Sequence, residues 1–237
     1  MALMECRDVS LGYEGKIILE DINFKLSGGE YLFIVGENGT GKSTLIKGLL
    51  RLKKPMSGSI TMGDGLKANE IGYLPQQTIT QKDFPASVYE VVLSGRLNSL
   101  SLRPFYGRKD KADAMDKLRL MGIEHLKNKC YQDLSGGQQQ RVLLARAMCA
   151  TKKMILLDEP VAGLDPIVTA ELYELIARIN KEIGITVIMV SHDMEALTKY
   201  ATHVLHLSQK QLFFGSREDY MKTSEGVFFT TGKESSK

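Results

Sequence analysis

Hydrophobic residues come in short runs over the first third of the chain, and glycines separate the runs. Apolar runs of this length bounded by glycine are typical of β-strands. A glycine-rich segment at residues 36–41 precedes a longer apolar pattern, which predicts a helix from Lys42 to about Leu52, with Pro55 marking its end. Strands are expected at residues 3–11, 17–26, 30–35, 59–62 and 71–74.

The middle third changes to a helical spacing of apolar positions. Helices are expected there at residues 87–95, 110–121 and 137–150. Strand-like and helix-like runs then alternate, which is typical of a mostly parallel sheet covered by helices. The strands of this last part are expected at 154–157, 185–190 and 203–207, and its helices at 167–183 and 194–199. We therefore predict an α/β core with an inserted helical subdomain, ending in a polar, frayed tail at residues 223–237.

Composition narrows the class of protein only slightly. The 237 residues, 43% hydrophobic and 25% charged, fit one domain or one domain with a subdomain. The net charge is +3 and Lys and Arg do not gather in one stretch, so we expect no nucleic-acid partner. No apolar run approaches the ~20 residues that span a bilayer, and the first residues do not resemble a signal peptide. We expect a cytoplasmic protein whose association with a membrane goes through a partner.

One segment matches the phosphate-binding P-loop pattern: Gly36-Glu37-Asn38-Gly39-Thr40-Gly41-Lys42-Ser43. A predicted strand precedes it and a predicted helix follows it, as the pattern requires. Glycines let successive backbone N–H groups point at phosphate oxygens, and the helix N-terminus adds partial positive charge. We expect Lys42 to bridge the β- and γ-phosphates of a nucleotide, and the Ser43 hydroxyl to ligate Mg²⁺.

An acidic pair follows the buried strand expected at residues 154–157. Asp158 and Glu159 come at its end, before Pro160. Phosphoryl transfer needs charge neutralisation and alignment, so two acids with different roles are chemically sensible here. We expect Asp158 to hold Mg²⁺, directly or through water, and Glu159 to position and polarise the attacking water.

A second glycine-rich helix start lies far from the first. In Leu134-Ser135-Gly136-Gly137-Gln138, Ser135 can cap the helix with Gln138 three residues on, as in a capping box. The two glycines leave backbone amides open to an anion. One nucleotide site needs only one such loop, so we expect this loop to serve the nucleotide held by a second copy of the domain.

These residues resemble the ABC ATPases, and the segment at 134–138 is similar to the signature motif of that family. Further matches follow in the family's order and cover nearly the whole chain. Tyr13 sits where an aromatic ring stacks on adenine, and Asp165 lies in a segment like the D-loop. His192 resembles the switch histidine. Gln76 or Gln77 resembles the Q-loop glutamine, and Gln76 is preferred because the family places this residue directly after a proline.

The resemblance implies a P-loop NTPase (RecA-like) core with an N-terminal antiparallel β subdomain and an inserted α-helical signature subdomain. A single ABC ATPase domain would then span residues 1–237, with 1–80 and 151–237 as the nucleotide-binding core and 81–150 as the helical subdomain.

The family's mechanism implies two such domains paired head to tail, each ATP lying between one P-loop and the opposite signature loop. By this resemblance Glu159 would act as the base, His192 would contact the γ-phosphate, and Gln76 would join Ser43 and Asp158 around Mg²⁺. The residues that would contact nucleotide are Tyr13, Gly36, Glu37, Asn38, Gly39, Thr40, Gly41, Lys42, Ser43, Thr44, Ser135, Gly136, Gly137, Gln138 and Asp165.

Two segments are similar to importer ATPases for metals. Residues 87–96 resemble a helix of metal and iron-chelate importers, and residues 160–166 resemble the zinc and manganese branch. This implies membrane permease subunits, indirectly an extracytoplasmic solute-binding protein, and a place on the inner face of the cell membrane. The alternative is a soluble ABC ATPase of the iron–sulfur-assembly type, whose partners would be soluble scaffold proteins.

Overall fold

The computed structural model describes residues 2–76, 85–100 and 103–231. The chain forms two compact units. The first unit combines residues 1–68 with residues 186–237, and the second comprises residues 69–185. The predicted helical subdomain at 81–150 falls within the second unit. Among the described residues, no helix combines the length and the apolar character needed to cross a bilayer.

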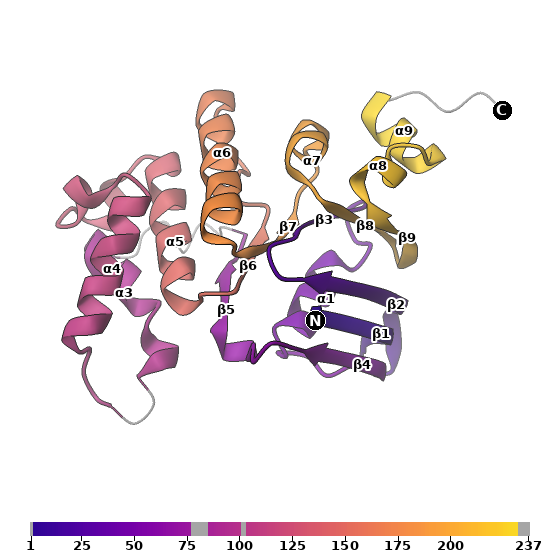
Figure 1. The fold of residues 1–237 in the computed structure, drawn as a ribbon, viewed down its shortest axis with the longest axis horizontal. Helices are drawn as coiled ribbons and strands as arrows, with labels where there is room; N and C mark the ends of the chain where they lie inside the picture. The colour runs from indigo at the N-terminus through magenta and orange to yellow at the C-terminus, as the bar shows by residue number, and fades with distance from the viewer. Residues whose placement is uncertain (1, 77–84, 101–102, 232–237) are drawn as a thin grey trace. The chain divides into compact units, whose positions relative to one another are not determined.

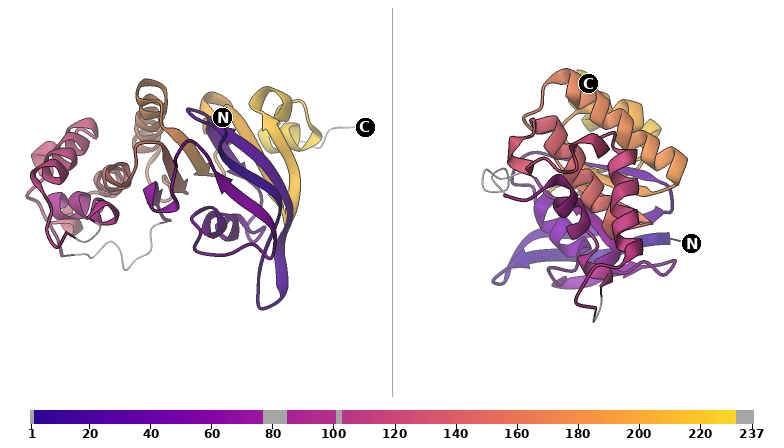
Figure 2. Two further views of the ribbon diagram at one scale, coloured as in Figure 1. Left: turned by 60° about the horizontal axis from the view of Figure 1, so that its bottom comes forward. Right: turned by 90° about the vertical axis from the view of Figure 1, so that its left-hand side faces the viewer.

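The first unit begins with an antiparallel sheet (Figure 1). Strands β1 (Ala2–Tyr13) and β2 (Lys16–Ser27) pair along their lengths, and β4 (Ser57–Met62) pairs with the other edge of β1. Figure 2 shows β1 and β2, in indigo, as a long twisted ribbon. Glu14 and Gly15 both have positive φ, 49° and 81°, as a two-residue hairpin turn requires.

The same unit continues into a parallel arrangement. Strand β3 (Tyr31–Val35) lies between β7 (Thr186–Val190) and β8 (His203–Ser208) and runs parallel to both, while β9 (Lys210–Ser216) returns antiparallel to β8. The order of strands in this unit is β4-β1-β2-β9-β8-β3-β7. Every residue of β3 and β7 is buried, as expected for central strands covered on both faces.

Helix α1 (Lys42–Leu49) follows β3 and packs against β1 and β2. The expected end at Leu52 is wrong by one turn. Arg51 takes a left-handed conformation (φ 55°), and the backbone N–H groups of Leu52 and Lys53 both donate to the carbonyl of Lys47. These bonds close the helix before Leu52. Helix α7 (Met194–Tyr200) follows β7, as the sequence predicts.

The described part of the C-terminal tail is helical, contrary to the expectation, whereas residues 232–237 lie outside the described residues. The tail predicted to fray from residue 223 contains helix α9 (Ser224–Thr231), and the short helix α8 (Arg217–Tyr220) precedes it. Ser216 caps α8 by accepting from the backbone N–H of Asp219 (3.1 Å). Tyr220 is fully buried and anchors this segment.

The second unit is mainly helical. Its strands β5 (Ile71–Leu74) and β6 (Met154–Asp158) are parallel neighbours, and its helices are α3 (Val88–Ser94), α4 (Arg108–Leu120), α5 (Gly136–Ala150) and α6 (Pro166–Ile183). Helix α5 packs against the other three and against β5. A Cβ atom at Gly72 of β5 would lie 2.3 Å from the carbonyl oxygen of Ala147, so glycine permits this close approach. Short 3₁₀ turns occupy Ala68–Glu70, Leu97–Ser99, Glu124–Leu126 and Tyr131–Asp133.

Candidate functional site

The predicted phosphate loop connects β3 to α1 in the first unit. Its glycines are required by geometry: Gly39 and Gly41 have φ of 82° and 98°, a region that side chains disfavour. A Cβ atom at Gly36 would lie 2.2 Å from the carbonyl oxygen of Leu207 on β8. The loop therefore holds a tightly curled backbone that other residues could not adopt.

Lys42 is buried within this loop, with 7% of its surface exposed. Its Nζ donates to the carbonyls of Gly36 (2.7 Å) and Glu37 (2.8 Å), and Thr40 Oγ1 donates to Glu37 as well (2.8 Å). The N-cap of α1 is Gly41, which supplies no side-chain cap. A helix N-terminus without a side-chain cap, next to a buried ammonium, suits a bound anion.

The other residues expected at the nucleotide divide by exposure. Glu37, Asn38, Gly39 and Ser43 are exposed, whereas Gly36, Thr40 and Thr44 are buried. Ser43, the predicted Mg²⁺ ligand, is thus an exposed residue in the first turn of α1.

Tyr13 ends β1 and is 43% exposed. Lys47 Nζ donates to its hydroxyl (3.3 Å), and the Nζ of Lys53 lies 3.7 Å from the ring centroid. The hydrogen bond from Lys47, together with one from Thr44 and the two lysine charges, holds the pKa of Tyr13 below its usual range. The aromatic side chain predicted to stack on adenine is therefore partly open and partly covered by cations.

His192 is exposed and follows β7 after one residue. The cap of helix α7 is Asp193, whose Oδ1 accepts from the backbone N–H of Ala196 (2.9 Å). Capping is therefore performed by the neighbouring residue, and the role of His192 as a γ-phosphate contact stays a prediction.

In the second unit, the acidic pair lies where β6 ends. Asp158 is the last strand residue and is 8% exposed. Burial raises the pKa of Tyr73 to about 12, and the negative charge of Asp158 contributes to this rise. Glu159 has a left-handed backbone (φ 48°), an unusual conformation for a residue other than glycine. Such strained positions occur at functional sites more often than elsewhere.

Gln76 and Glu159 lie next to each other. Strands β5 and β6 are parallel neighbours, so the residues that follow them meet at one edge. The Nε2 of Gln76 donates to Oε2 of Glu159 at 2.8 Å. The residue that we preferred for the Q-loop therefore directly contacts the predicted base. Its rival Gln77 lies outside the described residues.

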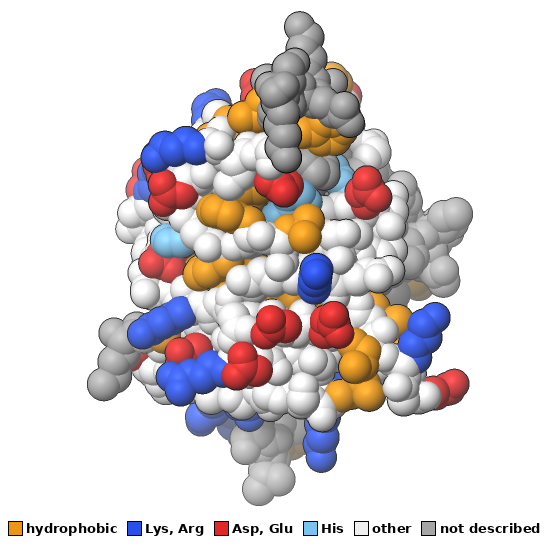
Figure 3. Space-filling view, turned by 90° about the vertical axis from the view of Figure 1, so that its right-hand side faces the viewer, with side chains coloured by type: hydrophobic (Ala, Val, Ile, Leu, Met, Phe, Trp, Pro, Cys, Tyr) orange, Lys and Arg blue, Asp and Glu red, His pale blue; other side chains and the backbone are white. Residues whose placement is uncertain are grey.

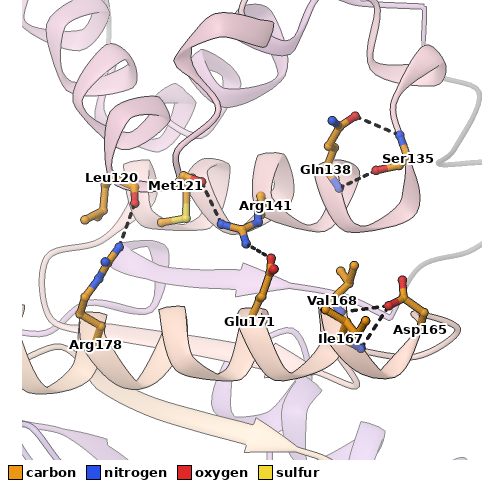
Figure 4. A network of polar contacts seen from close by, with 10 residues as sticks. All are labelled: Leu120, Met121, Ser135, Gln138, Arg141, Asp165, Ile167, Val168, Glu171 and Arg178. Carbon is orange, nitrogen blue, oxygen red and sulfur yellow. Dashed lines mark hydrogen bonds and ion pairs between the residues drawn. The ribbon is translucent and has the colours of Figure 1, made fainter.

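The signature segment forms the capping box that the sequence predicts (Figure 4). Ser135 Oγ accepts from the N–H of Gln138 (3.4 Å), and Gln138 Oε1 accepts from the N–H of Ser135 (3.2 Å). Ser135 and Gly136 are exposed. A Cβ atom at Gly137 would lie 2.4 Å from Cγ1 of Val168 in α6, so this glycine also has a packing role that the sequence did not indicate.

Asp165 is the N-cap of α6. Its Oδ1 accepts from the N–H groups of Ile167 and Val168, both at 3.1 Å, and Pro166 occupies the first helical turn (Figure 4). This cap is a complete structural role within the chain. The predicted contact of Asp165 with nucleotide stays a prediction.

Sequence reasoning missed two arginines that join three helices (Figure 4). Arg141 of α5 donates to the carbonyl of Met121 (3.2 Å) and pairs with Glu171 of α6 (2.8 Å). Arg178 of α6 donates to the carbonyl of Leu120 (3.5 Å). Both acceptors lie at the C-terminal end of α4, where carbonyls lack intrahelical partners. These contacts join residues 20 and 58 positions apart, so no local sequence signal indicates them.

The fold and these motifs define a P-loop NTPase of the ATP-binding-cassette class. The model of the family described as ABC transporter matches residues 19–162, and the chain belongs to this family. It is an ATP-binding domain that hydrolyses ATP, as the sequence predicted.

Two relatives match along most of their length. The chain is 34% identical over 224 residues to the zinc uptake system ATP-binding protein ZurA of Listeria monocytogenes, covering 92% of this chain and 87% of that protein. It is 37% identical over 219 residues to the manganese transport system ATP-binding protein MntB of Bacillus subtilis, with 91% and 87% covered.

A solved structure shows the same fold. It is an inward-facing ABC transporter described as of metal-chelate type, with a TM-score of 0.87 and 29% identity, covering 99% of this chain and 90% of that chain. The predicted P-loop NTPase fold with an antiparallel β subdomain is thereby confirmed.

Proposed function

We propose that this chain is the ATP-hydrolysing subunit of an ABC importer for a metal ion, zinc or manganese, or for a metal chelate. The observation that carries the proposal is the similarity to zinc and manganese ATP-binding proteins over about nine tenths of the chain. The resemblance of residues 87–96 and 160–166 to the metal branch supports it.

The phosphate loop is the part of the chain that we propose to hold ATP. A Cβ atom added at Gly36 would lie 2.2 Å from the carbonyl oxygen of Leu207, so the curled loop at residues 36–41 needs glycine there. Lys42 supplies a buried ammonium beside a helix start without a side-chain cap. On binding, Lys42 exchanges its carbonyl partners for phosphate oxygens, while Tyr13 stacks on the base. Thr44, buried at the first turn of α1, completes the phosphate contacts.

Mg²⁺ fits the donors that the chain offers. The hydroxyl of Ser43, the carboxylate of Asp158 and the amide oxygen of Gln76 are the hard oxygen ligands that this cation prefers. When bound, Mg²⁺ neutralises charge on the phosphates.

Glu159 is proposed as the base that polarises the attacking water, with His192 at the γ-phosphate. Gln76 donates to the Glu159 carboxylate and so fixes its direction.

The signature residues Ser135, Gly136, Gly137 and Gln138, together with Asp165, are proposed to contact the ATP held by a second copy in a head-to-tail homodimer. Ser135 and Gly136 are exposed at the start of α5, as this role requires. We retain the single-domain organisation, with 81–150 as the helical subdomain that responds to membrane subunits.

The partners proposed are integral membrane permease subunits and, through them, an extracytoplasmic solute-binding protein. The chain would then lie in the cytoplasm, peripheral on the inner face of the membrane. No nucleic-acid partner is proposed, because Lys and Arg do not gather in one stretch of the sequence. On the one face drawn in Figure 3, Lys and Arg side chains are interspersed with Asp and Glu.

Co-purification of the chain from its native membrane, followed by mass spectrometry, tests the transport role. We expect a polytopic membrane protein to co-purify with the chain. Cells that lack this membrane protein should then take up less zinc or less manganese. If only soluble scaffold proteins co-purify, without a membrane protein, the ATPase activity is unaffected but the transport role is refuted in favour of an assembly-type ATPase.

A further inference from the structure

The ring of Tyr13 is held by two lysines that come from α1 and the turn after it. Lys53 Nζ lies over the ring, 3.7 Å from its centroid, and Lys47 Nζ lies 5.7 Å from the centroid while donating to the hydroxyl at 3.3 Å. A cation over the face of a tyrosine ring within about 6 Å is attracted by the negative face of the π-system. Lys53 therefore occupies one face of the ring, and Lys47 holds its polar edge.

The backbone that carries Lys53 is fixed at both ends of a short turn. The left-handed Arg51 (φ 55°) reverses the chain after α1, and the N–H of Lys53 donates to the carbonyl of Lys47 at 3.1 Å. Three residues later, the N–H of Met56 donates to the carbonyl of Ser10 on β1 at 2.8 Å. Because Tyr13 ends the same strand, the turn and the ring are tied to one framework.

Lys53 differs from its neighbour in exposure. Lys53 is half-buried, although a lysine in a surface turn is ordinarily exposed, and the adjacent Lys54 is exposed. Tyr13 keeps 43% of its surface exposed with one face covered by Lys53. A base stacked at van der Waals distance cannot share a face with an ammonium 3.7 Å from the centroid.

We propose that Lys53 is a positioning residue for the nucleobase: it holds Tyr13 from one face, so that the opposite face forms a fixed platform for the adenine of ATP. This inference rests on the proposed stacking role of Tyr13. An ordered ring costs less conformational entropy on binding than a mobile one. The charge contributes too, because a cation on one face draws π-electron density away and favours stacking of an electron-rich purine on the other.

The test measures the Kd of the full chain by calorimetry in the presence of Mg²⁺, for ATP and for inorganic triphosphate. Lys53→Met keeps the length of the side chain without the charge, and Lys53→Arg keeps the charge. We expect Lys53→Met to weaken ATP binding by about two- to fivefold, with triphosphate binding unchanged. Lys53→Arg should restore most of the affinity, which a role in packing alone would not require.

The matched control is Lys54→Met, which removes the same charge one residue away and should leave both Kd values unchanged. Thermal melting of each variant reports whether the fold is intact. Unchanged ATP affinity in Lys53→Met would overturn the inference. Tighter binding would overturn it as well, because it would show that Lys53 competes with the base for the same face. Weaker triphosphate binding would show a phosphate contact instead.

A double-mutant cycle separates this inference from the proposed site. In a Tyr13→Ala background, Lys53→Met should cause no further loss of ATP affinity, because its effect passes through the ring. An equal loss in that background would show that Lys53 touches the nucleotide itself and would refute the positioning role. If Tyr13→Ala alone binds ATP as tightly as the unaltered chain, the stacking role fails, and the inference fails with it.

Discussion

The two glycine-rich helix starts of this chain differ in how they satisfy their own backbone. At α1 the cap is Gly41, which has no side chain to offer, and a buried Lys42 lies beside it. At α5 the cap is Ser135, which forms a complete capping box with Gln138 within the chain. The first start leaves its amides to an external anion, whereas the second is already stable by itself.

The same contrast extends to the surrounding residues. In the first unit Lys42 is held by the carbonyls of Gly36 and Glu37, next to the uncapped start of α1. In the second unit the expected site residues contact one another: Gln76 with Glu159, Ser135 with Gln138, and Asp165 with the start of α6. We therefore expect substitutions in the phosphate loop of the first unit to act mainly on ATP affinity, and substitutions at Glu159 and Ser135 of the second unit to act mainly on turnover and on pairing with another copy.

The largest effect is expected for Glu159→Gln. The amide keeps the shape of the side chain and the contact with Gln76, but it cannot accept a proton from water. Steady-state ATP hydrolysis should fall by about 10²–10⁴-fold, with the Kd for ATP little changed. Normal hydrolysis by this variant would remove Glu159 from the role of base and weaken the division between the two units.

Lys42→Met should act on affinity instead. It removes the buried ammonium that two carbonyls hold in the loop, and a charge-assisted hydrogen bond to phosphate is lost with it. ATP binding should weaken by about 10- to 100-fold in calorimetry. The exposed Lys54→Met serves as the charge control. If Lys42→Met binds ATP normally but hydrolyses it slowly, the assignment of affinity to the first unit is wrong.

Ser135→Arg should separate binding from pairing. Binding of ATP to the P-loop is expected to persist, but ATP-driven dimers, detected by light scattering in a Glu159→Gln background, should be lost because the arginine blocks the exposed start of α5. Ser135→Thr retains an oxygen for the cap and controls for loss of helix stability. A dimer of undiminished stability would refute the proposed contact in trans.

Two neighbouring glycines of α5 should respond differently to alanine. At Gly137 the added Cβ would lie 2.4 Å from Val168, whereas at Gly136 its nearest neighbour is a leucine methyl 3.3 Å away. Gly137→Ala should lower the free energy of unfolding by ~1–3 kcal/mol in urea titration. Gly136→Ala is the matched control and should change it much less. Equal effects would show that α6 moves aside readily.

The smallest effect is a pH dependence at His206. Burial lowers the pKa of this histidine against the opposing charges of Glu225 and Glu37, and Tyr220 is its hydrogen-bond partner at 3.2 Å. The unfolded chain then binds a proton more readily, so stability should fall as pH drops below about 6.5. Urea titrations at pH 7.5 and 5.5 should show a smaller loss for His206→Gln, whose amide can still meet Tyr220. An identical loss would assign the acid sensitivity to other groups.

Much of the fold was predictable because local signals were strong. The capping box at Ser135 formed as predicted, and β1, β3 and β7 lie close to their expected ranges. The errors arose where the apolar pattern does not show the conformation of the backbone. Helix α1 ends early because Arg51 adopts a left-handed conformation and the N–H groups of Leu52 and Lys53 both donate to the carbonyl of Lys47, and the expected frayed tail contains α9.

The sequence by itself determined the chemistry of this protein: the phosphate loop, the acidic pair after β6 and the signature segment are all local patterns whose spacing specifies the class of site. Only the tertiary structure decided which residues meet. It brought Gln76 to Glu159 because β5 and β6 are parallel neighbours, and it placed Lys53 over Tyr13 because a turn after α1 is tied to β1. Periodicity records which face of an element is apolar, but the partner of each polar side chain depends on how distant elements pack.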